Sequence, residues 1–216
     1  NVTGGGNYLV NGSGGAFTGA ATGLYATYTS NGAGTSALYT VDNTVLAFVA
    51  VNYWDGTTQF KIIGSGSVAT IASNLDNKPD VVLHAPEAPE IFFEDYGAGK
   101  LISGKAHIIL DPIFSRNVTI NDKHPLRVFI QLEGDCNGVY VANKSKAGFD
   151  VVELKNGNSD VSFQWHIICN RADEVLSNGK ISHNENIRFE QAPDEMQKLN
   201  FNPNSNSGNS LQKSKT

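Results

Sequence analysis

LRVFIQLEGDCNGVYVANKSKAGFDVVELKNGNSDVSFQWHIICN, residues 126–170, decides the fold. Four segments of this stretch, LRVFIQLE, GVYVAN, FDVVEL and VSFQWHIICN, are rich in the β-branched and aromatic residues that strands favour. The short runs between them contain the glycine, asparagine, aspartate and serine residues that supply turn geometry. Because loops this short join antiparallel neighbours, the stretch predicts a four-stranded antiparallel meander.

Side chains alternate between the two faces of a strand, so one face of each segment is predicted to point to the core. That face is apolar in all four segments, and in the third it ends in a glutamate. Its members are Val128, Ile130, Leu132, Val139, Val141, Phe149, Val151, Glu153, Val161, Phe163 and Trp165. A second layer has to cover an apolar sheet face. We therefore predict an all-β chain with an antiparallel β-sandwich over residues 60–190.

The second layer is predicted to come from strands that precede this stretch. Residues 57–74 have the pattern of two strands around a Gly-Ser-Gly turn, and residues 99–111 have the pattern of another hairpin. Pro86 and Pro89 exclude a helix interior and a central strand. Between the hairpins we therefore expect an extended connector that ends in an edge strand at Glu90–Phe93.

The first part of the chain differs in composition from the rest. Its first 60 residues contain two charged side chains, both aspartates, and many glycines. They also contain too many large apolar residues for a solvated linker. We predict a Gly-rich, low-charge β segment over residues 1–59, the sandwich over residues 60–190, and a polar flexible tail over residues 191–216.

Tyr25, Tyr39 and Tyr53 recur at a fixed spacing within this Gly-rich segment. Fixed spacing with alternating small and large residues indicates stacked short strands. Three chains could each supply one side of a shared shaft, in which small residues allow close approach and charge would be costly. We predict such a homotrimer. A β-meander within a monomer is the alternative.

The overall charge argues against two classes of partner. A net charge of -5 and an isoelectric point near 5.5 give no basic field of the kind that nucleic acid requires. The sequence also has no apolar run near the roughly 20 residues that span a bilayer. We therefore expect neither nucleic-acid binding nor a membrane span.

The motif EGDCNG, residues 133–138, could be a reactive site, a metal site or a turn. A meander places Cys136 and Cys169 at opposite ends of the sheet, about 25 Å apart at ~3.3 Å per residue. A disulfide requires Cα atoms within about 7 Å. The neighbouring acidic side chains Glu133 and Asp135 would raise the pKa of the Cys136 thiol, which does not suit a nucleophile. We therefore predict a turn with two free cysteines.

The densest acidic group precedes the edge strand. It consists of Glu87, Glu90, Glu94 and Asp95, with His84 close by. Paired carboxylates could serve glycoside hydrolysis or bind calcium. The alternative is a solvated acidic edge that discourages sheet pairing. The histidine and cysteine spacings contain no zinc motif. We predict no catalytic, cofactor-binding or metal-binding residues.

Exposed tyrosine and asparagine side chains on loops are the candidates for contact with a ligand. The candidate ligand contacts are Tyr96, Asn137, Tyr140 and Asn143.

Three long phrases carry a resemblance to a known group of proteins. They lie within residues 84–114, 124–154 and 163–174, and begin HAPEAPEIFF, HPLRVFIQLE and FQWHIICN. They resemble the C-terminal module of largely uncharacterised bacterial secreted, surface and tail-fibre-like proteins. In those proteins the module follows Gly-rich repeats with G-[VL]-Y elements, similar to the GLY at residues 23–25.

The resemblance implies an extracellular or virion location and a trimeric, β-rich fibre that ends in a compact module. We predict a non-enzymatic structural or adhesive fibre protein of a bacterial surface or phage-like particle. It would self-assemble and bind a cell-surface glycan or protein. The alternatives are a tail-spike-like polysaccharide hydrolase, with carboxylates near residues 87–95, and a monomeric carbohydrate-binding module.

Overall fold

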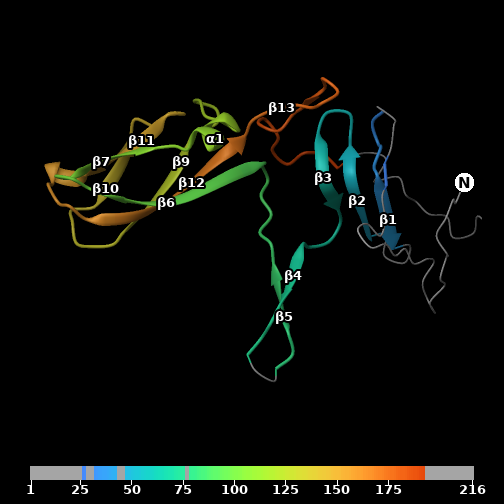
Figure 1. Ribbon diagram of the computed structural model, residues 1–216, viewed down its shortest axis with the longest axis horizontal. Helices are drawn as coiled ribbons and strands as arrows, with labels where there is room; N and C mark the ends of the chain where they lie inside the picture. The colour runs from blue at the N-terminus through green and yellow to red at the C-terminus, as the bar shows by residue number, and fades with distance from the viewer. Residues whose placement is uncertain (1–25, 28–31, 43–46, 76–77, 193–216) are drawn as a thin grey trace, which may run out of the picture. The chain divides into compact units, whose positions relative to one another are not determined.

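The computed structural model describes residues 26–27, 32–42, 47–75 and 78–192 (Figure 1). Strands make up 48% of the structure and helices 5%, so the predicted all-β class is confirmed. The described residues fall into two compact units, with the boundary between Gly66 and Ser67. No helix in these ranges is long and apolar enough to cross a membrane.

The first unit is a three-stranded antiparallel sheet. Its strands are β1 (Leu38–Asp42), β2 (Ala47–Trp54) and β3 (Gln59–Gly64), in the order β1-β2-β3. The turn between β2 and β3 is fixed by Asp55, whose Oδ1 accepts hydrogen bonds from the backbone N–H groups of Thr57 and Thr58, at 2.6 Å each. The sequence pattern predicts that the Gly-rich segment ends at residue 59. Because β3 pairs with β2, the first unit extends beyond that residue. The described part of the segment is thus a meander formed within one chain.

The tyrosines of the predicted repeat do not lie in equivalent surroundings. Tyr39 is exposed and stacks on Phe48, with 5.8 Å between ring centroids. Tyr53 is only 2% exposed. Tyr25 lies outside the described residues. The shared trimeric shaft stays a prediction.

The second unit begins with a hairpin of two short strands, β4 (Ala69–Ala72) and β5 (Val81–His84). These strands pair with each other, and β3 pairs with β2. The hairpin predicted over residues 57–74 is therefore wrong. The Gly64-Ser65-Gly66 turn leads from one unit to the other and does not join paired strands.

Two larger antiparallel sheets follow. In the first, β12 is central, with β6 on one side and β9 and β8 on the other; in the second, the order is β10-β11-β7. The bounds are β6 (Phe92–Lys100), β7 (Lys105–Ile109), β8 (Val118–Thr119), β9 (Arg127–Leu132), β10 (Val139–Ala142), β11 (Gly148–Glu153) and β12 (Ser162–Arg171). The edge strand predicted at Glu90–Phe93 is present as β6, but it begins at Phe92.

The predicted four-stranded meander is wrong in its pairing, although all four strands exist. Of the four, β10 pairs with β11, whereas β9 pairs with β12. The chain therefore passes from one sheet to the other through the loop at residues 133–138, and back again after β11. A loop that is short enough for a hairpin is also long enough to cross between layers about 10 Å apart.

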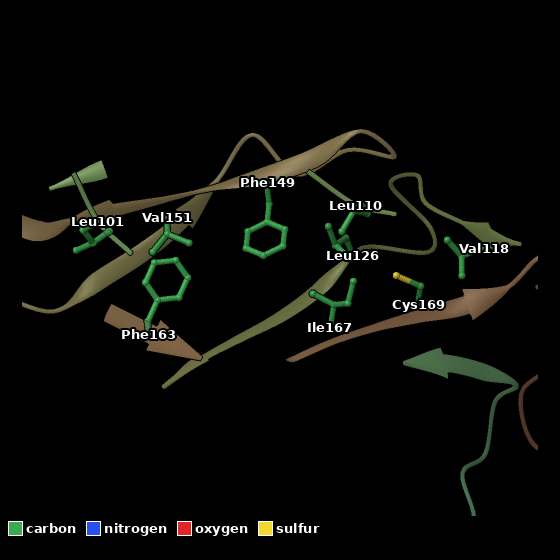
Figure 2. Close-up of a cluster of buried hydrophobic side chains, with 9 residues drawn as sticks. All are labelled: Leu101, Leu110, Val118, Leu126, Phe149, Val151, Phe163, Ile167 and Cys169. Carbon is green, nitrogen blue, oxygen red and sulfur yellow. The ribbon is translucent and has the colours of Figure 1, made fainter. Parts of the chain in front are cut away.

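One hydrophobic core is filled from both sheets. Figure 2 shows Phe149 and Val151 of β11 directed toward Phe163 and Ile167 of β12. The buried residues of this core are Leu101, Leu110, Val118, Leu126, Phe149, Val151, Phe163, Ile167 and Cys169. The predicted inward faces are confirmed except at Val161, which precedes β12 and is not part of this core. Glu153 is also buried, and the inward residues of β9 and β10 pack against the core. A common core is what a sandwich requires, and the sandwich arrangement itself stays a prediction.

Two glycines adapt the edge strand β6 to the large rings of β12. A Cβ atom at Gly97 would lie 2.2 Å from Trp165 Cζ2, and one at Gly99 would lie 2.4 Å from Phe163 Cζ. Each aromatic ring therefore covers the glycine backbone across the strand pair. The side chains between and beside these glycines, including Tyr96, point to the opposite face of the sheet.

The remaining elements are short. The tight turn between β6 and β7 has positive φ at Ser103 and Gly104 and is closed by the single bridge between Ile102 and Lys105. Because β6 pairs with β12 and β7 pairs with β11, the hairpin predicted over residues 99–111 is wrong. The other elements are α1 (Pro112–Arg116), the 3-10 helix η1 (Leu154–Asn156), β13 (Glu174–Val175) and β14 (Ile181–Ser182). In Figure 1, α1 lies in the connection that follows β7.

Candidate functional site

The EGDCNG loop, residues 133–138, is a turn that is hydrogen-bonded to the buried carboxylate of Glu153. Glu153, at the end of β11, is 3% exposed. Its Oε1 accepts hydrogen bonds from the backbone N–H and the side-chain Nδ2 of Asn137, at 3.0 and 3.1 Å. Its Oε2 accepts a bond of 2.8 Å from the backbone N–H of Ser159. These donors lower the pKa of Glu153, with the Asn137 backbone as the largest cause. Asn137 therefore holds the loop in place.

The two cysteines are free, as predicted. Cys136 is half-buried in the turn, where its Sγ accepts a hydrogen bond from the backbone N–H of Gly138 at 3.4 Å. Cys169 is fully buried in the core, and this burial raises the pKa of its thiol to about 11. A neutral thiol in an apolar core is inert at neutral pH.

The four candidate ligand contacts do not come together in one place. Tyr96 lies on the outer face of β6, and Tyr140 lies on the outer face of β10, in the other sheet. Asn143 follows β10 and donates a hydrogen bond of 2.6 Å to Asp150. The second oxygen of Asp150 contacts His107 Nδ1 at 2.6 Å. Tyr96 and Tyr140 are the two candidates that remain free to contact a ligand through an exposed ring.

Tyr96 belongs to a row of three rings on the outer face of the β12 sheet. Strand register places His166 of β12 between Tyr96 of β6 and Phe129 of β9. The Tyr96 and His166 rings stack, with centroids 4.4 Å apart and planes 13° apart. The Phe129 and His166 centroids are 5.6 Å apart. Tyr96 is 64% exposed and Phe129 55% exposed. We call Tyr96, His166 and Phe129 the aromatic row.

Glu94 fixes two members of the aromatic row. Its Oε2 accepts a hydrogen bond from the Tyr96 hydroxyl and a second one, of 3.0 Å, from His166 Nε2. The Tyr96 hydrogen bond is the largest cause that lowers the pKa of Glu94, and the same bond raises the pKa of Tyr96. Since Nε2 faces a carboxylate, the His166 tautomer in this arrangement carries its proton on Nε2. The rings are thus held in one orientation before any ligand arrives.

The other acidic residues lie elsewhere. Glu90 accepts hydrogen bonds from Asn170, at 2.8 Å, and from Arg188, at 2.5 Å. Glu94 and Asp95 are consecutive in β6, so their side chains leave the strand on opposite faces. His84 lies on β5. Among the described residues, no group of three or more histidine, cysteine, aspartate or glutamate side chains could hold a metal ion.

The sequence contains a signal for two members of the aromatic row. Phe129 and His166 occupy the alternate positions of strands whose other face is apolar, so alternation already assigns them to the outer face. An aromatic residue at such a position has no core role. These two rings lie next to Tyr96 only because β6, β12 and β9 pair in this register. A local sequence pattern cannot predict such a pairing.

Comparisons of the chain with models of protein families, with curated proteins and with solved structures found no match. The resemblance, over roughly residues 60–190, to the module of secreted, surface and tail-fibre-like proteins therefore stays a prediction.

Proposed function

We propose that the chain is a non-enzymatic structural or adhesive protein of a bacterial surface or phage-like particle. In this proposal it self-assembles and binds a saccharide at a cell surface. The observation that supports adhesion is the aromatic row, in which two exposed rings flank the half-buried ring of His166, with a carboxylate at their side. Ring faces offer apolar area next to polar handles, which suits the C–H faces and hydroxyl groups of a sugar.

The aromatic row is suited to binding because it is rigid. Cross-strand stacking on His166 and the hydrogen bonds to Glu94 hold the rings. Side chains that are already ordered lose little entropy when a ligand binds. β6 is the edge strand, so no other strand of the described residues pairs with the outer side of β6, beside Tyr96. A sugar ring would stack on this side, within reach of the Glu94 carboxylate.

Self-assembly is supported by the β4–β5 hairpin. Ile71 and Val82 are paired on one face and are 74% and 55% exposed, while Leu83 on the other face is 58% exposed. A two-stranded hairpin is marginal in water unless another layer covers it. In the proposal, the corresponding surfaces of neighbouring copies cover these apolar side chains, and the assembly is a homotrimer.

Sedimentation or mass photometry of the purified chain tests the assembly. We expect a trimer, which Ile71→Asp should dissociate because the substitution places a charge in the covered surface. A monomer at micromolar concentration, unchanged by this substitution, contradicts the assembly part of the proposal.

A glycan array followed by calorimetry tests adhesion. We expect saccharide binding that Tyr96→Ala and Phe129→Ala each weaken, because each substitution removes one exposed ring. Phe189→Ala is the matched control, since Phe189 is 75% exposed and lies outside the row. Binding that both row variants retain in full contradicts the assignment of adhesion to this surface.

A further inference from the structure

A pocket of about 430 Å³ opens beside the outer face of the β10-β11-β7 sheet. Its base is a row across the three strands, in which Val152 of β11 lies between Tyr140 of β10 and Lys105 of β7. Its wall is the segment that follows β11, including Lys155, and the turn before β7. This volume is within the range of ligand pockets, about 300 to 1,000 Å³.

The charged residues that line the pocket have a net positive charge. Lys105 and Lys155 both line it, and neither ammonium group makes an ion pair with a described carboxylate. Glu153 also lines the pocket and is ionised, because the hydrogen bonds from Asn137 and Ser159 stabilise its carboxylate, so the lining holds two positive charges and one negative charge. Asp160, next to the wall, accepts a bond of 2.8 Å from the backbone N–H of Ser103. The pocket therefore favours an anion.

Three polar side chains of the pocket lining, two in the wall and one in the base, have no protein partner within the described residues. The side-chain amides of Asn156 and Asn158 and the hydroxyl of Tyr140 make no hydrogen bond within the described structure. Each can donate to or accept from a hydroxyl group. Tyr140 is 50% exposed and also offers a ring face. A ligand that suits this lining has one negative charge and several hydroxyl groups.

Backbone hydrogen bonds fix the wall, and two of its residues have unusual backbone conformations. Lys155 and Asn156 have φ values of 55° and 49°, in the left-handed region. The backbone N–H of Leu154 donates to Gly138 O at 2.9 Å, and that of Gly104 donates to Ser159 O at 2.8 Å. A Cβ atom at Gly104 would lie 2.0 Å from the carbonyl oxygen of Gly157, so the two loops are in direct backbone contact. Conformations of this kind persist where the surroundings enforce them, and they concentrate at ligand sites.

We propose that this pocket binds an acidic sugar, a hexuronic acid unit of a surface polysaccharide. Its carboxylate would lie between the ammonium groups of Lys105 and Lys155. Its hydroxyl groups would bond to Asn156, Asn158 and Tyr140, and its ring would contact the Tyr140 phenol. The site goes beyond the proposed function, because it lies in a different sheet from the aromatic row and takes a charged sugar.

Calorimetric titration of the purified full chain with methyl glucuronide tests this site, with methyl glucoside and inorganic phosphate as the two comparison probes. We expect saturable binding of the glucuronide, no saturation by the glucoside in the same range, and weaker binding of phosphate. Lys105→Gln and Lys155→Gln should each weaken the glucuronide at least tenfold. Lys146→Gln, outside the pocket, should leave binding unchanged.

Three results overturn the acidic-sugar site. They are the absence of glucuronide binding, equal binding of phosphate and glucuronide, and glucuronide binding that survives both lysine variants. Circular dichroism of each variant checks that the fold is retained. Tyr96→Ala should keep full glucuronide affinity. The experiment therefore distinguishes a failure of the proposed saccharide binding at the aromatic row from a failure of the proposed binding in this pocket.

Discussion

The indole ring of Trp165 fills the space beside Gly97, and a Cβ atom at residue 97 would lie 2.2 Å from Trp165 Cζ2. The ring also packs edge-on against Phe149 of the other sheet, with centroids 6.1 Å apart. Trp165 therefore cannot move away from residue 97 without disturbing the core. The edge strand β6, which carries Tyr96 and Glu94, depends on this contact.

Gly97→Ala should lower the free energy of unfolding by about 1–3 kcal/mol, the usual cost of forcing extra volume into a packed core. Urea denaturation followed by tryptophan fluorescence measures the change. Ala98→Ser is the control, because Ala98 points to the exposed outer face; its effect should stay within about 0.5 kcal/mol. Equal stability of Gly97→Ala and the parent would contradict the packing of Trp165 on this strand.

The hydrogen bond between Tyr96 and Glu94 should be visible in the titration of the phenol. Glu94 raises the pKa of Tyr96 above 10.0 and has its own pKa lowered. Absorbance at alkaline pH should therefore show a late-ionising tyrosine that Tyr96→Phe removes. Glu94→Gln should return this ionisation to the ordinary range. Tyr140→Phe serves as the matched control and should leave the late step in place.

The hydrogen-bonded pair of Tyr96 and Glu94 should make the stability of the protein depend on pH. Since the folded pKa of Glu94 is lowered, its carboxylate contributes stability above the unfolded pKa, and this contribution is lost as pH falls through the folded pKa. The parent should therefore be more stable than Glu94→Gln at pH 6 to 8. The difference should shrink as the solution becomes acidic. Thermal melts of both proteins across pH give the comparison, and a gap that widens toward low pH would refute it.

The two thiols should differ in reactivity. At pH 8, a thiol reagent such as DTNB should label Cys136 in the native protein and leave Cys169 unlabelled, because burial raises the pKa of Cys169 to about 11. In denaturant both thiols should react. Native Cys136→Ser should then show no fast-reacting thiol. Fast labelling of this variant would mean that Cys169 is not buried as described.

Glu153→Gln should destabilise the contact between the loop that contains Asn137 and the loop that contains Ser159, because the Glu153 carboxylate accepts hydrogen bonds from both. The amide NH2 group would face the N–H donors of Asn137 or Ser159, leaving at least one buried donor without an acceptor. Glu87→Gln, at an exposed position, should have little effect. Chemical denaturation measures the difference between these variants. Hydrogen exchange at Asn137 and Ser159 should also accelerate in Glu153→Gln, and unchanged protection there would contradict the capping role.

Much of the local structure could be predicted from the sequence, because strand periodicity is a local property. The buried positions Phe149, Val151 and Phe163 follow from alternation alone, and even Glu153 was assigned to the inner face. The sequence also predicts two free cysteines, although the four-stranded meander on which this prediction rests does not form. Turn residues between segments indicated where strands end.

Pairing could not be predicted, because the loops that separate the strands suit either a hairpin or a crossing between sheets. The register that places His166 opposite Tyr96 joins β12 to β6, which lie far apart in the sequence. The aromatic row, and the pocket between Lys105 and Lys155, exist only because of such distant pairings. Residue type and a position on a predicted loop are enough to single out Tyr96 and Tyr140 as candidate ligand contacts. The residues that surround them in space can be identified only once the strand pairing is known.

The position of β12 has a consequence for the biosynthesis of the protein. This strand is the common partner of β6, β8 and β9, and it is the last of that sheet to leave the ribosome. Until residues 162–171 emerge, the three earlier strands have no template on which to align. A nascent polypeptide stalled before this point would present unpaired edges to chaperones, so the sheet that bears the aromatic row can close only after β12 has been synthesised.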